Sequence, residues 1–154
     1  MSNKFGNYQI QDIDSYLFTH FRFVFGYDNS SETYKVVMLM MDEARNKTHV
    51  QVLSDNVWKT IPDFPAVPLP CLYDGPGGSD GVYLNDCLNW LAIHNHPVCI
   101  YGWKNTKAKE FVIVSLDMRT ESYMQLMPPR GFDEMSYVVE PSICILKDSF
   151  VFFS

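Results

Sequence analysis

The chain has 154 residues, about the length of one domain. Hydrophobic residues make up 47% of the sequence and charged residues 19%, which provides enough apolar surface for a folded core and excludes disorder over most of the length. The 12 basic and 18 acidic side chains give a net charge of −6, which argues against nucleic acid as a partner.

The sequence also argues against a membrane partner. Its longest apolar run, Val36 to Met41, is much shorter than the roughly 20 residues that cross a bilayer. The first residues contain no apolar core of a secretory signal. The four cysteines are widely spaced and form no C-x-x-C pair, which is typical of reduced thiols. We therefore expect a cytoplasmic or nuclear protein.

Residues 1–20 carry only a weak helical pattern, at Ile10 to Phe18, and are expected to be a weakly structured N-terminal segment. From Phe21 onward, short apolar runs rich in Val, Ile, Phe and Tyr alternate with clusters of Gly, Pro, Asn and Asp. This pattern predicts an all-β fold. The ten expected strands are Phe21 to Phe25, Tyr34 to Met41, His49 to Leu53, Val57 to Ile61, Val82 to Leu84, Cys87 to Ile93, Phe111 to Leu116, Tyr123 to Met127, Ser142 to Leu146 and Phe150 to Phe153.

Two polar dipeptides indicate an internal repeat. Asn85-Asp86 and Lys147-Asp148 each separate two apolar runs, as in a two-residue hairpin, and the second follows the first by 62 residues. Four strands in about 60 residues are typical of a β-propeller blade. The sequence thus predicts a partial, kelch-like β-propeller of about two and a half four-stranded antiparallel blades. Because a closed propeller has at least four blades, we interpret the chain as a fragment or a truncated product.

One stretch matches a catalytic motif. The segment Gly77-Gly78-Ser79-Asp80-Gly81 fits G-x-S-x-G, in which the serine is a nucleophile on a turn from a strand into a helix. Here prolines precede the segment and a strand-like run follows it, so we interpret it as a surface loop. A serine hydrolase that uses Ser79 is the less favoured alternative, and no catalytic residue is predicted.

The residues after Ile93 are the candidate binding segment. His94 and His96 resemble metal ligands, but Pro97 interrupts the strand and no second ligand pair follows at a suitable spacing, so no metal site is predicted. Tyr101 and Trp103 are large aromatic residues in an irregular stretch. We predict that His94, His96, Tyr101 and Trp103 contact a protein partner; the alternative is that the aromatic pair packs against a blade edge. No phosphate-binding glycine loop occurs, so no cofactor is expected.

Several stretches together resemble the plant F-box associated (interaction) domain, and the resemblance extends from Phe21 to the C-terminus. They are Phe25-Gly26-Tyr27-Asp28, Tyr34-Lys35-Val36-Val37, Val57-Trp58-Lys59-Thr60-Ile61, Gly81-Val82-Tyr83-Leu84-Asn85, Leu88-Asn89-Trp90-Leu91-Ala92 and Phe111-Val112-Ile113-Val114-Ser115-Leu116-Asp117. Members of that family resemble kelch-type propellers that follow an F-box and act as substrate receptors of Skp-cullin-F-box ubiquitin ligases. No segment with F-box character precedes Phe21, so the Skp adaptor is expected as a partner only if an F-box is supplied elsewhere.

The resemblance implies a non-catalytic protein-interaction module whose protein substrate the sequence does not identify. The alternative is a non-functional or partner-dependent fragment of such a receptor, with open sheet edges. The loops expected to bind are Asp28 to Glu32, Tyr73 to Asp80, His94 to Trp103 and Arg130 to Tyr137.

Overall fold

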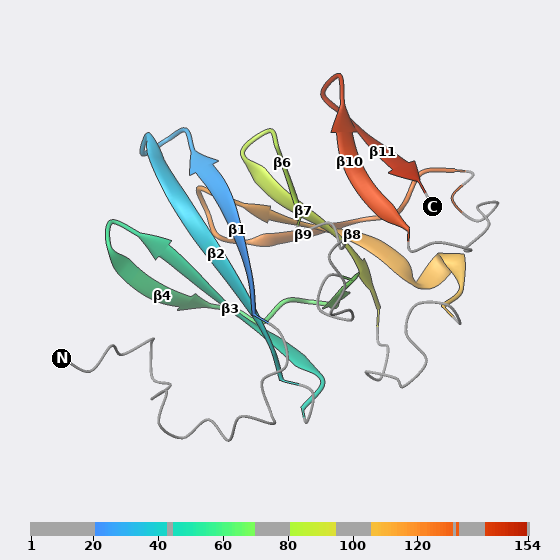
Figure 1. Ribbon diagram of the computed structural model, residues 1–154, viewed down its shortest axis with the longest axis horizontal. Coiled ribbons are helices and arrows are strands. Elements are labelled where there is room, and N and C mark those ends of the chain that lie inside the picture. The colour runs from blue at the N-terminus through green and yellow to red at the C-terminus, as the bar shows by residue number, and fades with distance from the viewer. Residues whose placement is uncertain are drawn as a thin grey trace.

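A computed structural model describes residues 21–42, 45–69, 81–94, 106–130, 132 and 141–153. These residues are mostly β-strand, as the sequence predicts (Figure 1). The expected N-terminal segment, residues 1–20, lies outside the described residues.

The first sheet, called blade 1 below, is a four-stranded antiparallel meander. Its strands are β1 (Phe21–Asp28), β2 (Thr33–Asp42), β3 (Lys47–Ser54) and β4 (Val57–Ile61), which pair in chain order. The chain needs only short connections between them because each strand pairs with the next one along the sequence. This is the arrangement of strands expected for a propeller blade.

Blade 2 is a second four-stranded meander, with a short 3₁₀ helix and a two-residue strand in addition. Its strands are β6 (Val82–Leu84), β7 (Cys87–Ile93), β8 (Phe111–Asp117) and β9 (Tyr123–Leu126), and a short 3₁₀ helix, Ala108–Glu110, leads into β8. A two-residue strand, β5 (Val67–Pro68), also pairs with β7, opposite Ile93 and Ala92. The sequence did not predict β5, because two residues carry no periodicity.

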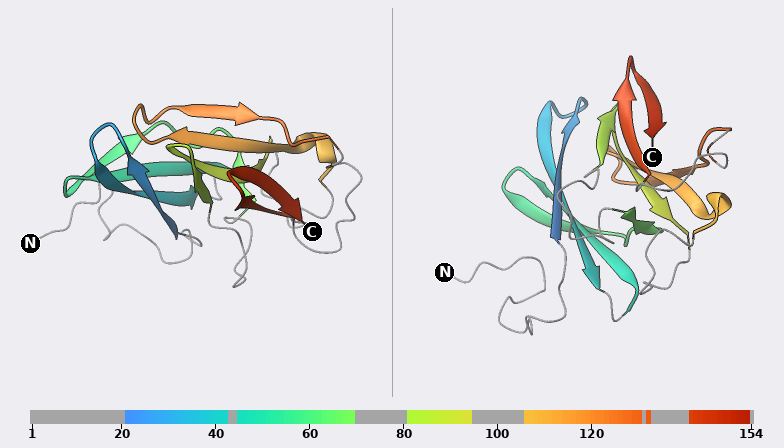
Figure 2. Two further views of the ribbon diagram at one scale, coloured as in Figure 1. Left: turned by 90° about the horizontal axis from the view of Figure 1, so that it is seen from above. Right: turned by 45° about the vertical axis from the view of Figure 1, so that its right-hand side comes forward.

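The hairpin β10 (Ser142–Leu146) and β11 (Ser149–Phe153) follows. It contacts β6 and β7, whereas β1 contacts β7 from blade 1, so blade 2 lies between its two neighbours (Figure 2). Two four-stranded units and a hairpin confirm the prediction of a partial β-propeller fold. All ten predicted strands are present, four of them with the predicted bounds.

The tight turns have the backbone conformation that their residues favour. In the turns at Asp55-Asn56, Asn85-Asp86 and Lys147-Asp148, both residues have φ between 49° and 62°. Two successive positive φ angles define a type I′ turn, whose twist matches that of the flanking strands. Asn and Asp tolerate this left-handed region better than other non-glycine residues do. The repeated hairpin inferred from the sequence is therefore confirmed.

The two central strands of blade 2 are buried on both faces. In β7 and β8 the apolar residues are almost continuous, as expected when both faces of a sheet are covered. One face packs against blade 1, and the other packs against the β10–β11 hairpin and Phe132. The side chains from β7 and β8 that face blade 1 are Leu88, Trp90, Ala92, Val112, Val114 and Leu116; those on the other face are Leu91, Ile93, Phe111 and Ile113.

A buried lysine connects the two blades. Lys35 of β2 is 5% exposed, and its Nζ lies 3.1 Å from Oδ2 of Asp28 and 3.3 Å from Oε1 of Glu121. The same ammonium group donates a hydrogen bond to the carbonyl oxygen of Met118 at 2.5 Å. Lys59 of β4 also reaches Glu121, with 2.6 Å between Nζ and Oε2. Two cations of blade 1 therefore hold the β8–β9 turn of blade 2.

A glycine allows this close approach. A Cβ atom at Gly26 would collide with the side chain of Met118 and would also meet Leu88. Met118 is fully buried against β1. At the residue that follows Gly26, the hydroxyl group of Tyr83 donates a hydrogen bond to the carbonyl oxygen of Tyr27 at 2.9 Å. The interface thus combines an apolar centre with polar contacts at the turns.

The charges of this cluster shift one another's pKa values. A hydrogen bond from Ser30 lowers the pKa of Asp28 well below its usual range, burial opposes this shift, and Lys35 adds to it. For Glu121, burial opposes the shift, but hydrogen bonds from Lys59 and Lys35 lower the pKa overall. Burial likewise opposes the rise in the pKa of Lys35, which Asp28 and Glu121 produce. All three groups are therefore charged at neutral pH.

We expect Lys35→Ala to lower the free energy of unfolding by about 3 kcal/mol, because the substitution leaves the carboxylate of Asp28 buried without its cation. Urea unfolding at neutral pH measures the loss. Lys47→Ala is the matched control, because Lys47 pairs with Asp63 at the exposed surface and should cost less than about 1 kcal/mol. Equal losses for the two variants would contradict the assigned role of Lys35.

The lowered pKa values also predict acid sensitivity. A carboxyl group whose pKa is lower in the folded state contributes stability above its unfolded pKa, about 4, and this contribution is lost as the pH falls through the folded value. Urea unfolding between pH 5 and pH 2.5 should therefore show a steep loss of stability. In Glu121→Gln one of the two groups is absent, so the slope should be shallower. If the variant loses stability with falling pH as steeply as the wild type, protonation of Glu121 does not contribute to the acid sensitivity.

Candidate protein-binding site

The two ends of the sheets differ in the length of their connections. At one end, called the turn end, lie the turns β1–β2, β3–β4, β6–β7, β8–β9 and β10–β11; Figure 1 shows the first, third and last of these at the top. The turns of the two blades meet there, because the side chain of Asn29 donates a hydrogen bond to Asp86. At the opposite end, called the loop end, lie the described residues 62–69, 94, 106–110, 127–130 and 132, where the longer connections begin or end. In such scaffolds long loops are the usual binding elements.

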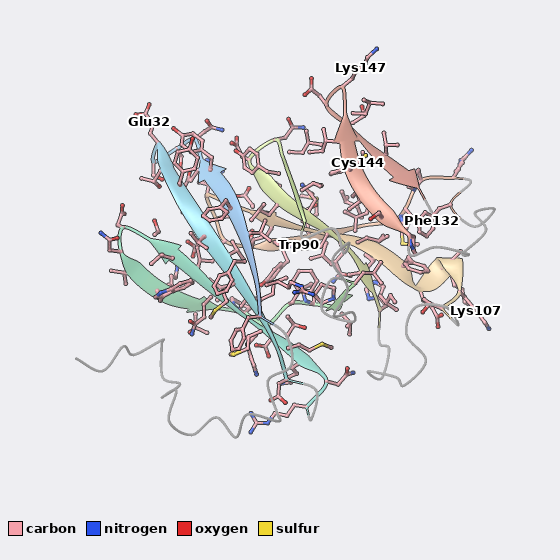
Figure 3. The ribbon with its side chains drawn as sticks, in the orientation of Figure 1. Glu32, Trp90, Lys107, Phe132, Cys144 and Lys147 are labelled. Carbon is pink, nitrogen blue, oxygen red and sulfur yellow. The ribbon has the colours of Figure 1, made fainter. Side chains whose placement is uncertain are left out.

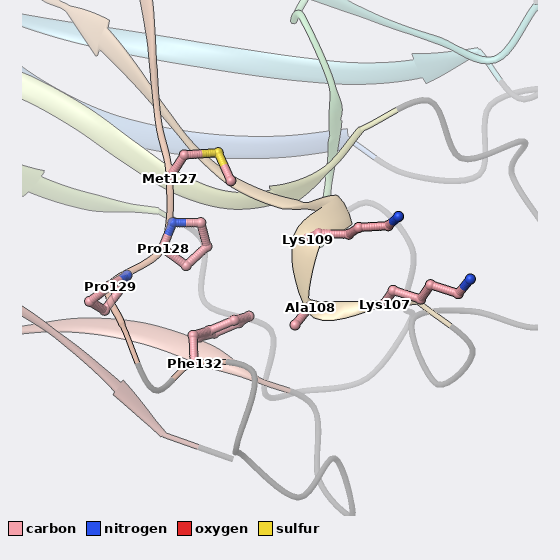
Figure 4. A pocket seen from close by; sticks show the side chains of 7 residues that line it. All are labelled: Lys107, Ala108, Lys109, Met127, Pro128, Pro129 and Phe132. Atoms are coloured by element: carbon pink, nitrogen blue, oxygen red, sulfur yellow. The ribbon is translucent and has the colours of Figure 1, made fainter.

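A groove opens at the loop end between two of these connections. It has a volume of about 390 Å³ and is formed by the segment before β8 and the segment after β9 (Figure 4). Most of its lining atoms are apolar. The lining residues are Lys107, Ala108, Lys109, Met127, Pro128, Pro129 and Phe132.

Hydrogen bonds fix the first wall of the groove to blade 2. The carboxylate of Glu110 accepts a hydrogen bond from the backbone N–H of Lys107 at 2.7 Å, and the N–H of Glu110 donates to the carbonyl oxygen of Lys107 at 2.8 Å. The backbone N–H of His94, at the end of β7, donates to the carbonyl oxygen of Glu110 at 2.8 Å. This wall is therefore tied to both central strands of blade 2.

The second wall is fixed by an aromatic contact. Phe132 is 4% exposed, and its ring packs edge-on against Phe111 with 5.2 Å between the ring centroids. Such a T-shaped pair adds to the stabilisation that burial alone provides. The backbone N–H of Phe132 donates to the carbonyl oxygen of Pro129 at 3.2 Å, which closes a turn after the two prolines. Figure 3 shows Phe132 and Lys107 near one another at the loop end and Lys147 at the turn end.

Two lysines line the first wall of the groove, and an arginine follows the second wall in the sequence. Lys107, Lys109 and Arg130 are all exposed, and none of them forms an ion pair with a described residue. The acidic side chain in this wall, Glu110, is turned to the backbone of Lys107. The groove therefore combines a largely apolar second wall with the lysines of the first wall.

The structure describes one of the four residues predicted to bind a partner. His94 is half-buried at the end of β7, where its backbone supports the first wall of the groove. His96, Tyr101 and Trp103 lie outside the described residues, as does Ser79. The role of these side chains stays a prediction.

The predicted binding loops do not share one end of the molecule. Asp28 to Glu32 is the β1–β2 turn, so it lies at the turn end, where Asp28 is buried beside Lys35. His94 and Arg130 begin two of the other predicted loops, and both lie at the loop end. Tyr73 to Asp80 lies outside the described residues.

The groove itself was not predicted. Its residues carry weak individual signals, namely a Lys-Ala-Lys segment before a strand and a Pro-Pro pair after one. Only the sheet order, which places the β7–β8 connection beside the chain that leaves β9, brings them together. The groove could have been found from the sequence only by predicting that β7, β8 and β9 pair in this order.

Metal ligands and thiols are two kinds of group that could carry chemistry in the described residues. Among them, no three His, Cys, Asp or Glu side chains group as metal ligands. The described cysteines, Cys87 and Cys144, are free thiols. Burial and the nearby charges of Asp117 and Asp86 raise the pKa of Cys87, which keeps its thiol protonated. No helix in the described ranges has the length and hydropathy needed to span a membrane.

Comparisons with known proteins agree with this architecture. A family model described as the F-box associated beta propeller domain matches residues 7–152. An F-box/kelch-repeat protein of Arabidopsis thaliana is 26% identical over 107 residues, which cover 68% of this chain and 25% of the relative. No solved structure matches the chain. The chain belongs to the F-box associated β-propeller family, which confirms the resemblance noted in the sequence. It spans about a quarter of the length of the curated relative that it matches.

Proposed function

We propose that this chain is a non-catalytic protein-interaction module that binds a protein substrate at its loop end. The observation that carries the proposal is the family match over nearly the whole chain, together with a groove between two long connections on the scaffold. Among the described residues that line the groove, none carries a hydroxyl, thiol, carboxylate or imidazole group. These residues offer no hydroxyl or thiol nucleophile and no carboxylate or imidazole base, and their chemistry suits binding.

In our proposal the module recognises substrates for a Skp-cullin-F-box ubiquitin ligase in the cytoplasm or nucleus. The similar Arabidopsis protein is an F-box/kelch-repeat protein, which supports this assignment. Contact with the Skp adaptor requires an F-box, and the family match concerns the β-propeller domain. We therefore assign substrate binding to this chain and adaptor binding to an F-box supplied elsewhere.

A second candidate function is that of a partner-dependent piece of a receptor. The observation that favours it lies on the face of blade 1 turned away from blade 2, where Phe23 is 51% exposed, Phe25 68% and Tyr34 78%. Three large aromatic side chains gathered on one sheet face are unusual for a free surface. In this alternative, another β-sheet covers them.

Affinity capture from plant extract, with the partners identified by mass spectrometry, tests the proposal. We expect Tyr101→Ala combined with Trp103→Ala to reduce recovery of the specific partner at least about tenfold, because truncation of aromatic anchors removes most of the binding energy of such loops. Lys147→Ala, at the turn end, is the control and should leave recovery unchanged.

A third variant, Phe25→Glu, separates the two candidate functions. If partners are captured through the loop end, this variant retains them. If recovery falls with Phe25→Glu and survives the change at Tyr101 and Trp103, the partner covers the aromatic face of blade 1 instead. That result would contradict substrate binding at the loop end.

A further inference from the structure

We infer that the groove at the loop end binds an acidic peptide segment that inserts an apolar side chain. This inference rests on the proposed function, because it names the class of substrate that the same end of the module accepts. It concerns the groove formed by residues 107–109, 127–129 and 132. The argument has an electrostatic part and an apolar part.

The electrostatic part begins with the net charge. The whole chain carries −6, yet Lys107 and Lys109, which line the groove, have no described anionic partner, and neither has Arg130, which follows Pro129 in the sequence. At the turn end, in contrast, Glu121 pairs with Lys35 and Lys59. An anionic ligand could form ion pairs with these basic groups. Complementary charge around a binding site guides association and excludes partners of the wrong sign.

The apolar part concerns the second wall of the groove. Met127 is 68% exposed, and Pro128, Pro129 and Phe132 continue the apolar surface beside it. Methionine adapts to ligands of irregular shape, and proline loses little conformational entropy on binding. Figure 4 shows Met127 and the two prolines on one side of the groove, facing Ala108 and Lys109 across it. A leucine or aromatic side chain placed between them would contact both walls.

A peptide fits these features better than a nucleic acid. A phosphate backbone requires many cations in a continuous stripe, and a chain with 12 basic and 18 acidic residues repels it elsewhere. An apolar wall opposite two lysines instead matches a protein segment that alternates acidic and apolar residues.

Fluorescence anisotropy with a labelled synthetic peptide tests the inference. The probe is a short peptide with Leu-Phe at its centre and two Glu residues on each side, titrated with the full chain at low salt. We expect Lys107→Glu combined with Lys109→Glu to weaken binding about tenfold, since each exposed charge contact contributes modestly. Lys147→Glu, an exposed lysine at the turn end, should change the affinity less than about twofold.

A second pair of variants tests the apolar part. Met127→Ala should weaken binding of the same peptide about threefold or more, because it removes exposed apolar surface that the ligand would cover. Met124→Ala is the matched control, because Met124 on β9 is also exposed, at 60%, and does not line the groove. All five substituted positions are exposed, and circular dichroism verifies that each variant keeps its fold.

Four results would overturn the inference. They are absence of binding by the acidic peptide, equal binding of a peptide with Gln in place of Glu, equal loss of affinity in the control variants, and tighter binding of a single-stranded oligonucleotide than of the peptide. If the partner captured from extract is retained by the Lys107 and Lys109 variant, this inference fails while protein binding stands. If the wild-type chain captures no partner but binds the peptide, the proposed function fails instead.

Discussion

The interface between the two blades depends on one buried cation. Lys35 lies between Asp28 on its own blade and Glu121 on the next, where burial strengthens each interaction and makes an unpaired charge costly. The ammonium group reaches the carbonyl oxygen of Met118 only because β1 lacks a side chain at Gly26, where Met118 packs. Charge and shape therefore fix the same contact, and a blade displaced along this interface would lose both.

The position of the candidate binding site follows from this contact. Because blade 1 covers one face of β7 and β8, Trp90 is completely buried between the blades (Figure 3). The other face of the same strands holds Phe111, on which Phe132 packs. The groove is therefore built on strands that are buried on both sides, although its own residues lie in connections. A groove whose walls are fixed in this way loses little conformational entropy when a ligand binds.

Most of the fold was predictable because it is encoded locally. Strand runs such as Cys87 to Ile93 and dipeptides such as Asn85-Asp86 specify their own conformation, and sequential pairing then gives the blades. The family resemblance rests on the same runs. The short strand β5 was missed because two residues, one of them a proline, give no pattern.

The contacts at the blade interface and in the groove were less predictable because they join distant parts of the chain. Lys35 stands just before the apolar run Val36 to Met41, where a charged side chain is normally expected at the surface, yet it is buried with its partner Glu121, which is 86 residues away. The groove likewise brings Lys107 beside Phe132 through sheet order. Sequence reasoning selected the aromatic and imidazole side chains of the β7–β8 connection, of which the structure describes His94, and did not select the residues that form the walls of the groove.

The most direct test of this account asks whether the two blades unfold as one unit. In a chain with Trp58→Phe and Trp103→Phe, the remaining tryptophan is Trp90, whose fluorescence reports on the interface between the blades. Urea unfolding is followed by this fluorescence and by far-ultraviolet circular dichroism, which reports on the strands. The account predicts that both signals change at the same urea concentration. A change in Trp90 fluorescence at lower urea, with the strand signal still intact, would contradict it.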